Sequence, residues 1–209
     1  MSKIYTNSEV IDYVWQYSKY HGNLMGYCDQ LADEGNGHIA LISLLNITEM
    51  IFKDRINDYD ERFFKVINKL RGRNSITQYE YVFLNNPNNG VRKIRNLLAH
   101  ANLSKYNIIL NNEDKELLYP LTENETCIKL YNIFSPIIFN IILRLISEDL
   151  IVDIEIDLEN FIKEINIEIK EISPEKLLEY KGLDYKEIDG WSDMNEETKY
   201  RLGENSSDV

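Results

Sequence analysis

The sequence has 209 residues, 44% of them hydrophobic, which is enough to bury the core of one domain with an appendage. Only nine glycines and four prolines occur, which argues against a disordered chain. The formal net charge of −12 belongs to residues 148–209, with 19 acidic and 7 basic side chains, whereas residues 1–147 hold 16 of each. The overall acidity therefore does not exclude a local basic surface on the first 147 residues.

Cys28 and Cys127 lie far apart and form no CxxC pattern. This spacing predicts free, buried thiols in a reducing compartment rather than a disulfide or a zinc site. The N-terminus lacks the apolar core of a signal peptide, and no run of about 18 apolar residues predicts a membrane span. The longest apolar stretch, 131–146, contains Pro136 and Arg144 and indicates a core helix. We expect a cytoplasmic protein with no membrane partner and no cofactor.

Helical signals dominate the first 149 residues. A capping box from Thr6 to Glu9 precedes the first predicted helix. Further helices are predicted over 23–37, 38–56 and 60–72, and a further helix start is predicted at 75–78. The apolar side of the 38–56 helix is expected to include Ile39, Ile42, Leu45, Met50 and Phe52.

The later segments are more mixed. Residues 85–90, NNPNNG, predict a loop, and 106–120 predict a β-hairpin. A cap at 122–125 starts the last long helix, which runs to about residue 149. Residues 150–158 alternate like a strand, 159–172 fit strand or helix, and 173–180 begin a helix with Ser and Pro. From about residue 184 the chain predicts a flexible acidic tail.

These patterns predict a mainly all-α protein with a minor β element. Residues 1–149 form a bundle of four to five main helices, 150–183 form an acidic appendage of strand and helix, and 184–209 form the flexible tail.

Residues 91–102, VRKIRNLLAHAN, divide cleanly on a helical wheel. The apolar arc holds Val91, Ile94, Leu97, Leu98 and Ala101. The polar arc holds Arg92, Lys93, Arg95, Asn96, Ala99, His100 and Asn102. A guanidinium can bind phosphate oxygens in bidentate fashion, and an imidazole can move a proton near neutral pH. No carboxylate lies in this segment, which disfavours a local metal site. The alternative interpretation is an ordinary solvated helix face.

Residues 95–100, RNLLAH, resemble the signature of the HEPN superfamily. That signature is Arg, a polar residue that is often Asn, three to five further residues, and His. Members are compact helical bundles, and many are metal-independent endoribonucleases of toxin–antitoxin, abortive-infection and CRISPR-associated defence. The resemblance extends in outline over residues 36–149, but only 95–100 are specific.

The resemblance implies that Arg95 and His100 are the catalytic pair, oriented by Asn96. It implies a homodimer in which two motifs face one cleft, and RNA cleavage by the substrate's own 2′-hydroxyl. Members paired with a nucleotidyltransferase antitoxin carry Tyr two residues after the His, whereas this chain has Asn102. The resemblance therefore does not extend to that type of antitoxin.

Several other polar residues are candidates for the same site. Phosphate contacts are predicted for Arg92, Lys93, Asn102, Arg71 and Arg73. Accessory polar groups from the 38–56 helix are predicted at Ser43, Asn46 and Glu49. A solvated helix surface is the alternative for both sets.

Three interpretations remain open for the acidic residues 148–209. They form a solvated surface, they bind a partner protein such as an antitoxin or effector, or they mask the basic face of the motif. For the whole chain, the alternative to an RNase is a non-catalytic HEPN-like interaction module that acts as an adaptor, an inhibitor or an assembly subunit.

Overall fold

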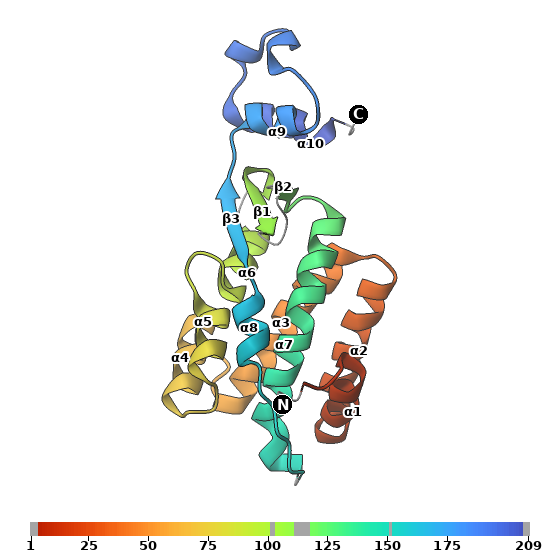
Figure 1. The fold of residues 1–209 in the computed structure, drawn as a ribbon, viewed down its shortest axis with the longest axis vertical. Helices are drawn as coiled ribbons and strands as arrows, with labels where there is room; N and C mark the ends of the chain where they lie inside the picture. Colours follow the sequence, from red (N-terminus) through yellow and green to blue (C-terminus); the bar gives the residue numbers. More distant parts are fainter. Residues whose placement is uncertain (1–3, 101–102, 111–117, 151, 207–209) are drawn as a thin grey trace.

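The computed structural model describes residues 4–100, 103–110, 118–150 and 152–206, without the side chains of His100, Leu110 and residues 118–120. Within these ranges it contains ten α-helices and one three-stranded sheet (Figure 1). The prediction of a mainly all-α protein with a minor β element is confirmed. The elements are α1 (Asn7–Tyr17), α2 (Lys19–Asp33), α3 (Gly37–Ile56), α4 (Phe63–Gly72), α5 (Gln78–Asn85), α6 (Val91–His100), η1 (Leu103–Lys105), β1 (Tyr106–Leu110), β2 (Leu118–Pro120), α7 (Asn124–Leu150), α8 (Glu159–Glu164), β3 (Ile167–Glu171), α9 (Pro174–Tyr180), η2 (Tyr185–Glu187), η3 (Trp191–Asp193) and α10 (Glu196–Asn205).

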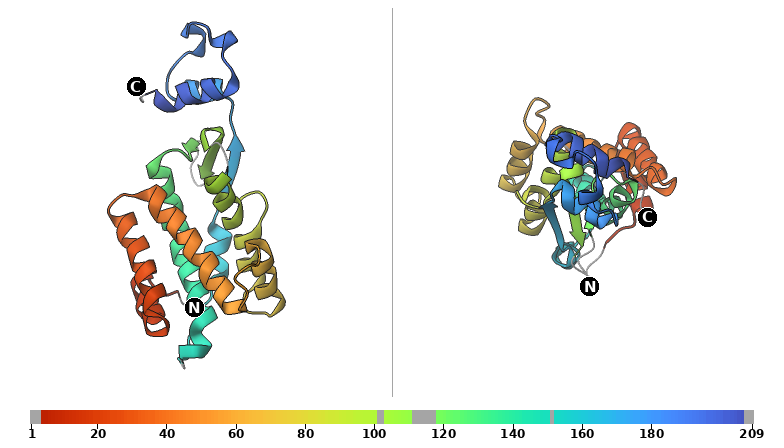
Figure 2. Two further views of the ribbon diagram at one scale, coloured as in Figure 1. Left: turned by 180° about the vertical axis from the view of Figure 1, so that it is seen from behind. Right: turned by 90° about the horizontal axis from the view of Figure 1, so that it is seen from above.

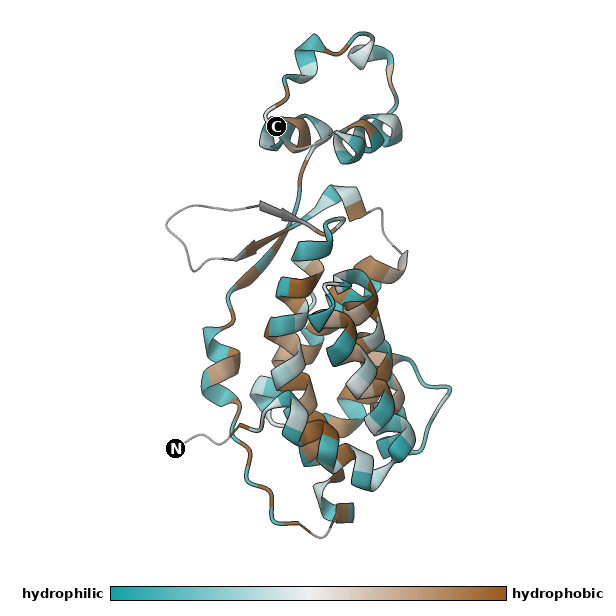
Figure 3. Ribbon diagram, turned by 90° about the vertical axis from the view of Figure 1, so that its right-hand side faces the viewer, coloured by the Kyte–Doolittle hydropathy of each residue, from teal (hydrophilic) through white to brown (hydrophobic). Residues whose placement is uncertain are grey.

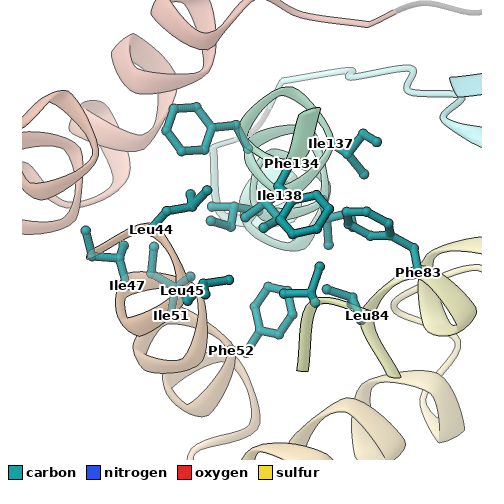
Figure 4. Packing of buried hydrophobic residues seen from close by; sticks show 14 of the residues in the cluster. Leu44, Leu45, Ile47, Ile51, Phe52, Phe83, Leu84, Phe134, Ile137 and Ile138 are labelled. Atoms are coloured by element: carbon teal, nitrogen blue, oxygen red, sulfur yellow. The ribbon is translucent and has the colours of Figure 1, made fainter. Parts of the chain in front are cut away.

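Helices α3 and α7 form the centre of the bundle, with α1 and α2 on one side and α4 to α6 on the other (Figures 1 and 2). Figure 4 shows Phe134 and Ile138 of α7 packed between Leu45 of α3 and Phe83 of α5. Hydrophobic residues recur along the helices of the bundle (Figure 3), and the buried ones form one core cluster. Helix α7 is long and apolar enough to span a bilayer, but 72% of its most apolar window is buried inside the protein.

The N-terminal segment is fixed to α7. The Tyr5 N–H donates to Asn140 Oδ1 at 2.9 Å, and Asn140 Nδ2 donates to the Tyr5 carbonyl at 2.7 Å. At the other end of the bundle, a Cβ on Gly37 would lie 2.3 Å from the Asn124 carbonyl oxygen, so glycine permits this close approach of α3 to α7. These contacts close the bundle between its first and last long segments.

Local capping explains two of the helix starts. The predicted capping box between Thr6 and Glu9 is present at α1. At α5 the cap is Thr77 with Glu80, two residues beyond the predicted start. Ser75 does not cap α5 because its N–H bonds the Leu70 carbonyl and closes α4 instead.

The predicted apolar side of α3 is partly wrong. Ile39 and Ile42 are 57% and 40% exposed, whereas Leu45 and Phe52 are buried as expected. Helix α3 packs on α2, α4, α6 and α7, so its buried surface extends over several sides. The buried residues are Gly37, Ala40, Leu41, Leu44, Leu45, Ile47, Thr48, Ile51, Phe52 and Ile56.

The predicted hairpin forms, because β1 pairs antiparallel with β2, and β3 joins the other edge of β1. Residues 159–172 divide into α8 and β3. The strand predicted over 150–158 is wrong, since 152–158 have no strand partner. Ile154 and Ile156 still pack on the core, and the Ile156 carbonyl accepts a hydrogen bond from Arg144 at 2.7 Å. The alternation of apolar and polar residues here therefore reflects an extended segment that packs one of its sides on the core.

Residues 184–206 form η2, η3 and α10, in contrast to the expected flexible tail. Asn195 caps α10, and the Tyr200 hydroxyl donates to the Ile172 carbonyl at 2.6 Å. Tyr200 packs in a small core with Ile172 and Leu177. Lys181 is buried and donates to the carbonyls of Glu204 and Ser206 at the end of α10. The apolar packing of Tyr200 and the hydrogen-bonded ends of α10 together give this acidic segment a folded structure.

Candidate functional site

Helix α6, which carries the motif, begins directly after the Asn-rich loop. Gly90 allows this entry, since a Cβ there would lie 2.6 Å from the Asn86 backbone nitrogen. Val91, Ile94 and Leu97 are buried, as the helical wheel predicts. The opposite side, with Arg92, Lys93, Arg95 and Asn96, is only partly buried, and Ala99 is exposed. The fold thus directs the polar arc away from the core.

Arg95 is held by a carboxylate from α3. Its Nη2 donates to Glu49 Oε2 at 2.9 Å, and its Nη1 donates to Asn96 Oδ1 at 3.4 Å. The other oxygen of Glu49 pairs with Lys53 Nζ at 2.9 Å. The side chains of Arg95 and Glu49 are 28% and 14% exposed. Arg95 is therefore oriented by its neighbours yet accessible, and the accessory candidate Glu49 lies beside it.

A cavity of about 490 Å³ opens beside this group. Its lining comes from α3, from α6 and from the connection into α4, namely Glu49, Lys53, Asp60, Glu61, Arg62, Phe63, Phe64, Arg92, Arg95 and Asn96. The motif residues Arg95 and Asn96 and the candidate Arg92 thus share one concave surface. Its volume falls in the range of about 300–1,000 Å³ that is usual for ligand sites.

Some charged side chains of this cavity have ion-pair partners, and others do not. Glu49 is paired on both oxygens, and Glu61 pairs with Lys65 and Lys69. Hydrogen bonds from Lys69 and from the Arg62 backbone hold the pKa of the Glu61 carboxyl below its ordinary value. The guanidinium of Arg62, in contrast, has no hydrogen-bond or ion-pair partner among the described residues. The lining carries four cationic side chains, Lys53, Arg62, Arg92 and Arg95, against three carboxylates, Glu49, Asp60 and Glu61, so its formal charge is +1. Because Glu49 and Glu61 are paired, the Arg62 guanidinium stays available for an anion, beside the exposed carboxylate of Asp60.

Sequence reasoning missed six of the lining residues, namely Lys53, Asp60, Glu61, Arg62, Phe63 and Phe64. Lys53 stands one turn beyond Glu49 on α3, so the spacing of the accessory candidates could have found it. Arg62 and Phe64 belong to no pattern in the sequence, and only the packing of α4 against α3 brings them to the motif.

A second, smaller cavity of about 120 Å³ also has Arg95 in its lining. It is lined by Ile42, Leu45, Asn46, Arg95, Leu98 and Ala99. Asn46 is therefore also placed beside the motif arginine. Ser43 is half-buried and lines neither of these two cavities.

The other predicted phosphate contacts are dispersed. Lys93 lies over the Tyr106 ring, 5.5 Å from its centroid. Arg71 donates to Gln78 and to the Ile76 carbonyl, and Arg73 donates to the Arg55 carbonyl, so both lie at the end of α4 and outside the large cavity.

Two predicted site residues cannot be placed in full. Asn102 and the side chain of His100 lie outside the described residues. The backbone of His100 forms the last position of α6.

The acidic third contacts the chain just beyond α6. Glu196 of α10 pairs with Lys105 at 2.9 Å, and Glu204 accepts a hydrogen bond from Ser104. As far as the structure describes the chain, no residue of 148–209 lines the large cavity. The partner-protein and masking interpretations of this segment remain predictions.

The cysteines and acidic groups offer no comparable site. Cys28 and Cys127 are free and buried, as predicted, and burial raises the pKa of each thiol to about 12. Among the described residues, no group of three or more His, Cys, Asp or Glu side chains is placed to hold a metal ion.

Comparison of the chain with protein-family models, with curated proteins and with solved structures finds no match.

Proposed function

We propose that this protein is a metal-independent endoribonuclease of HEPN type that acts in bacterial or phage conflict in the cytoplasm. The observation that carries the proposal is the position of Arg95. It lies on the rim of a cavity with Arg92 and Asn96, it is oriented by Glu49, and it remains partly exposed. An oriented, accessible guanidinium beside other cations suits a phosphodiester.

In the proposed reaction, the 2′-oxygen of the RNA attacks the adjacent phosphorus and the bond from phosphorus to the 5′-oxygen breaks. His100 takes the proton of the 2′-hydroxyl or delivers one to the departing 5′-oxygen. Arg95 stabilises the negative charge that builds on the phosphoryl oxygens, and Asn96 helps to orient it. The products carry a 2′,3′-cyclic phosphate and a 5′-hydroxyl. DNA lacks the attacking group and is refractory.

We further propose that the active form is a homodimer. Ile39 and Ile42 of α3 are exposed, and Ile42 shares the small cavity with Leu98 and Ala99 of α6. Ile42, Leu98 and Ala99 line that cavity together with Arg95, so a second copy that covered these apolar side chains would bring two motif helices together.

The test is to incubate the purified full-length protein with mixed single-stranded RNA and tRNA in EDTA. His100→Ala and Arg95→Ala are the test variants, and His38→Ala and Arg201→Ala are matched controls at positions outside the cavity. We expect cleavage by the wild type and both controls, with cyclic-phosphate ends, and a loss of at least a hundredfold in both test variants.

Cleavage that persists in His100→Ala would overturn the proposed mechanism. RNA binding by the wild type without cleavage would instead favour the non-catalytic interaction module.

A further inference from the structure

Phe64 lies on a side of α4 that does not face the core. The helix buries Phe63, Val66, Ile67 and Leu70, which define its core-facing side. Phe64 lies outside that set, is 43% exposed, and lines the same cavity as Arg95. The core therefore does not require an aromatic side chain here. Single exposed apolar residues are common on proteins, so the neighbours of this ring decide what it can do.

Those neighbours include the cationic Arg62 and Arg92, and the acidic Asp60 and Glu61 line the same cavity. The Arg92 guanidinium lies over the Phe64 ring, with its carbon 5.8 Å from the ring centroid. Arg92 is itself held in place, because its Nε donates to Asn85 Oδ1 at 2.6 Å. Arg62 is exposed at the start of α4, which has no side-chain cap, so the positive end of the helix dipole lies at the same cavity. One concave surface thus combines an accessible aromatic ring with three guanidinium groups.

We propose that Phe64 and Arg92 form a stacking subsite for a nucleobase of single-stranded RNA, with the attached phosphate held by Arg95. This inference rests on the function proposed above and adds to it the substrate class. Unpaired bases stack on aromatic rings and on guanidinium planes, whereas bases within a duplex are already stacked and paired. Phe64 is a binding residue here, without a part in the chemical step.

The subsite has a consequence for substrate choice. Because stacking reads the flat face of a base and not its edges, the preference should be for unpaired purines over pyrimidines, with little further sequence discrimination. Loops and single strands should therefore be cut in preference to duplex RNA.

The experiment measures binding separately from cleavage. The probe is a labelled oligoadenylate of about ten nucleotides whose 2′-hydroxyls are replaced by fluorine, so that the attack step cannot occur. Fluorescence anisotropy in EDTA gives the affinity of the full-length wild type, Phe64→Ala, Phe64→Trp and Phe161→Ala. Phe161 on α8 is 40% exposed and lies outside the cavity, so it is the matched control.

Phe64→Ala should weaken binding of the oligoadenylate by about tenfold to a hundredfold, while Phe64→Trp and Phe161→Ala bind as the wild type does. An abasic oligomer of equal length should bind wild type and Phe64→Ala alike, because only its phosphates make contacts. Excess AMP tests whether a free nucleotide suffices. We expect it to compete far less well than the oligomer, and equal competition per nucleotide would overturn RNA as the ligand.

The outcomes separate the two proposals. A wild type that cleaves RNA while Phe64→Ala binds the oligomer unchanged overturns the subsite and leaves the RNase. Binding that depends on Phe64 without any cleavage of natural RNA keeps the subsite and overturns the RNase. A wild type that neither binds nor cleaves single-stranded RNA overturns both.

Discussion

At the scale of single residues, the notable contact is the sharing of Glu49 between Arg95 and Lys53. A carboxylate that accepts from two cations restricts the rotamers of both, and its partial burial reduces screening by solvent. Arg95 consequently reaches the cavity with a defined orientation before any ligand arrives. Pre-orientation of this kind lowers the cost of binding a phosphate in a fixed geometry.

Removal of this carboxylate should therefore impair Arg95 more than it impairs the fold. We expect Glu49→Ala to lower the free energy of unfolding by about 1 kcal/mol, as for a partly exposed ion pair, and to lower kcat for RNA cleavage about tenfold with little change in KM. Glu49→Gln should recover part of kcat, because its amide oxygen can still accept from Arg95. Chemical denaturation and single-turnover cleavage measure the two effects.

The control for Glu49 is Glu125→Ala, an exposed carboxylate in the first turn of α7. Unchanged kcat in Glu49→Ala would show that Arg95 does not depend on this partner.

Part of this site could be predicted from the sequence, and the rest could not. Arg95, Asn96 and Glu49 could be predicted because helical periodicity places polar groups on known sides of two helices. Arg62 and Phe64 could not, because their approach to the motif depends on how α4 folds back on α3. The packing of two helices is a tertiary property that local periodicity does not encode.

At the scale of elements, helix caps were better guides than alternation. The Thr6 cap and the Ser173 cap mark real helix starts. The alternating residues 150–158 form no strand over 152–158, because the alternation of an extended segment does not provide a neighbouring strand with which to pair. Helix α10 was missed because its sequence is polar and its anchor, Tyr200, binds residues about thirty positions earlier. Composition alone therefore could not predict that residues 184–206 fold.

Lys181 offers a test of how α10 is held. Its ammonium group donates to two carbonyls at the C-terminal end of α10, where it also meets the negative end of the helix dipole. Lys181→Met should lose about 1–2 kcal/mol of local stability and speed amide hydrogen exchange in α10 roughly tenfold.

Exchange in α7 should not change, and Lys186→Met, at an exposed lysine of the same segment, should leave α10 protected. Equal protection of α10 in Lys181→Met and the wild type would mean that Tyr200 and Leu177 hold this helix without the lysine.

At the scale of the whole molecule, the proposed dimer requires an apolar side chain at Ile42 of α3. Ile42 lies beside Leu98 and Ala99, so a glutamate there would place a charge in the proposed interface. We expect the wild type to sediment at twice its chain mass of 24.7 kDa and Ile42→Glu to sediment as a monomer with little RNase activity. Val82→Glu, at a similarly exposed position on α5, should remain dimeric and active.

A monomeric wild type at tens of micromolar would contradict the dimer.

The two hydrogen bonds between Tyr5 and Asn140 also set the earliest point in translation at which the helical bundle can close. Helix α1 leaves the ribosome early, but it packs on α7, which is synthesised last among the bundle helices. At about 5–20 residues per second, Tyr5 waits on the order of ten seconds for its partner. A nascent chain therefore carries the motif before it has a bundle to support it.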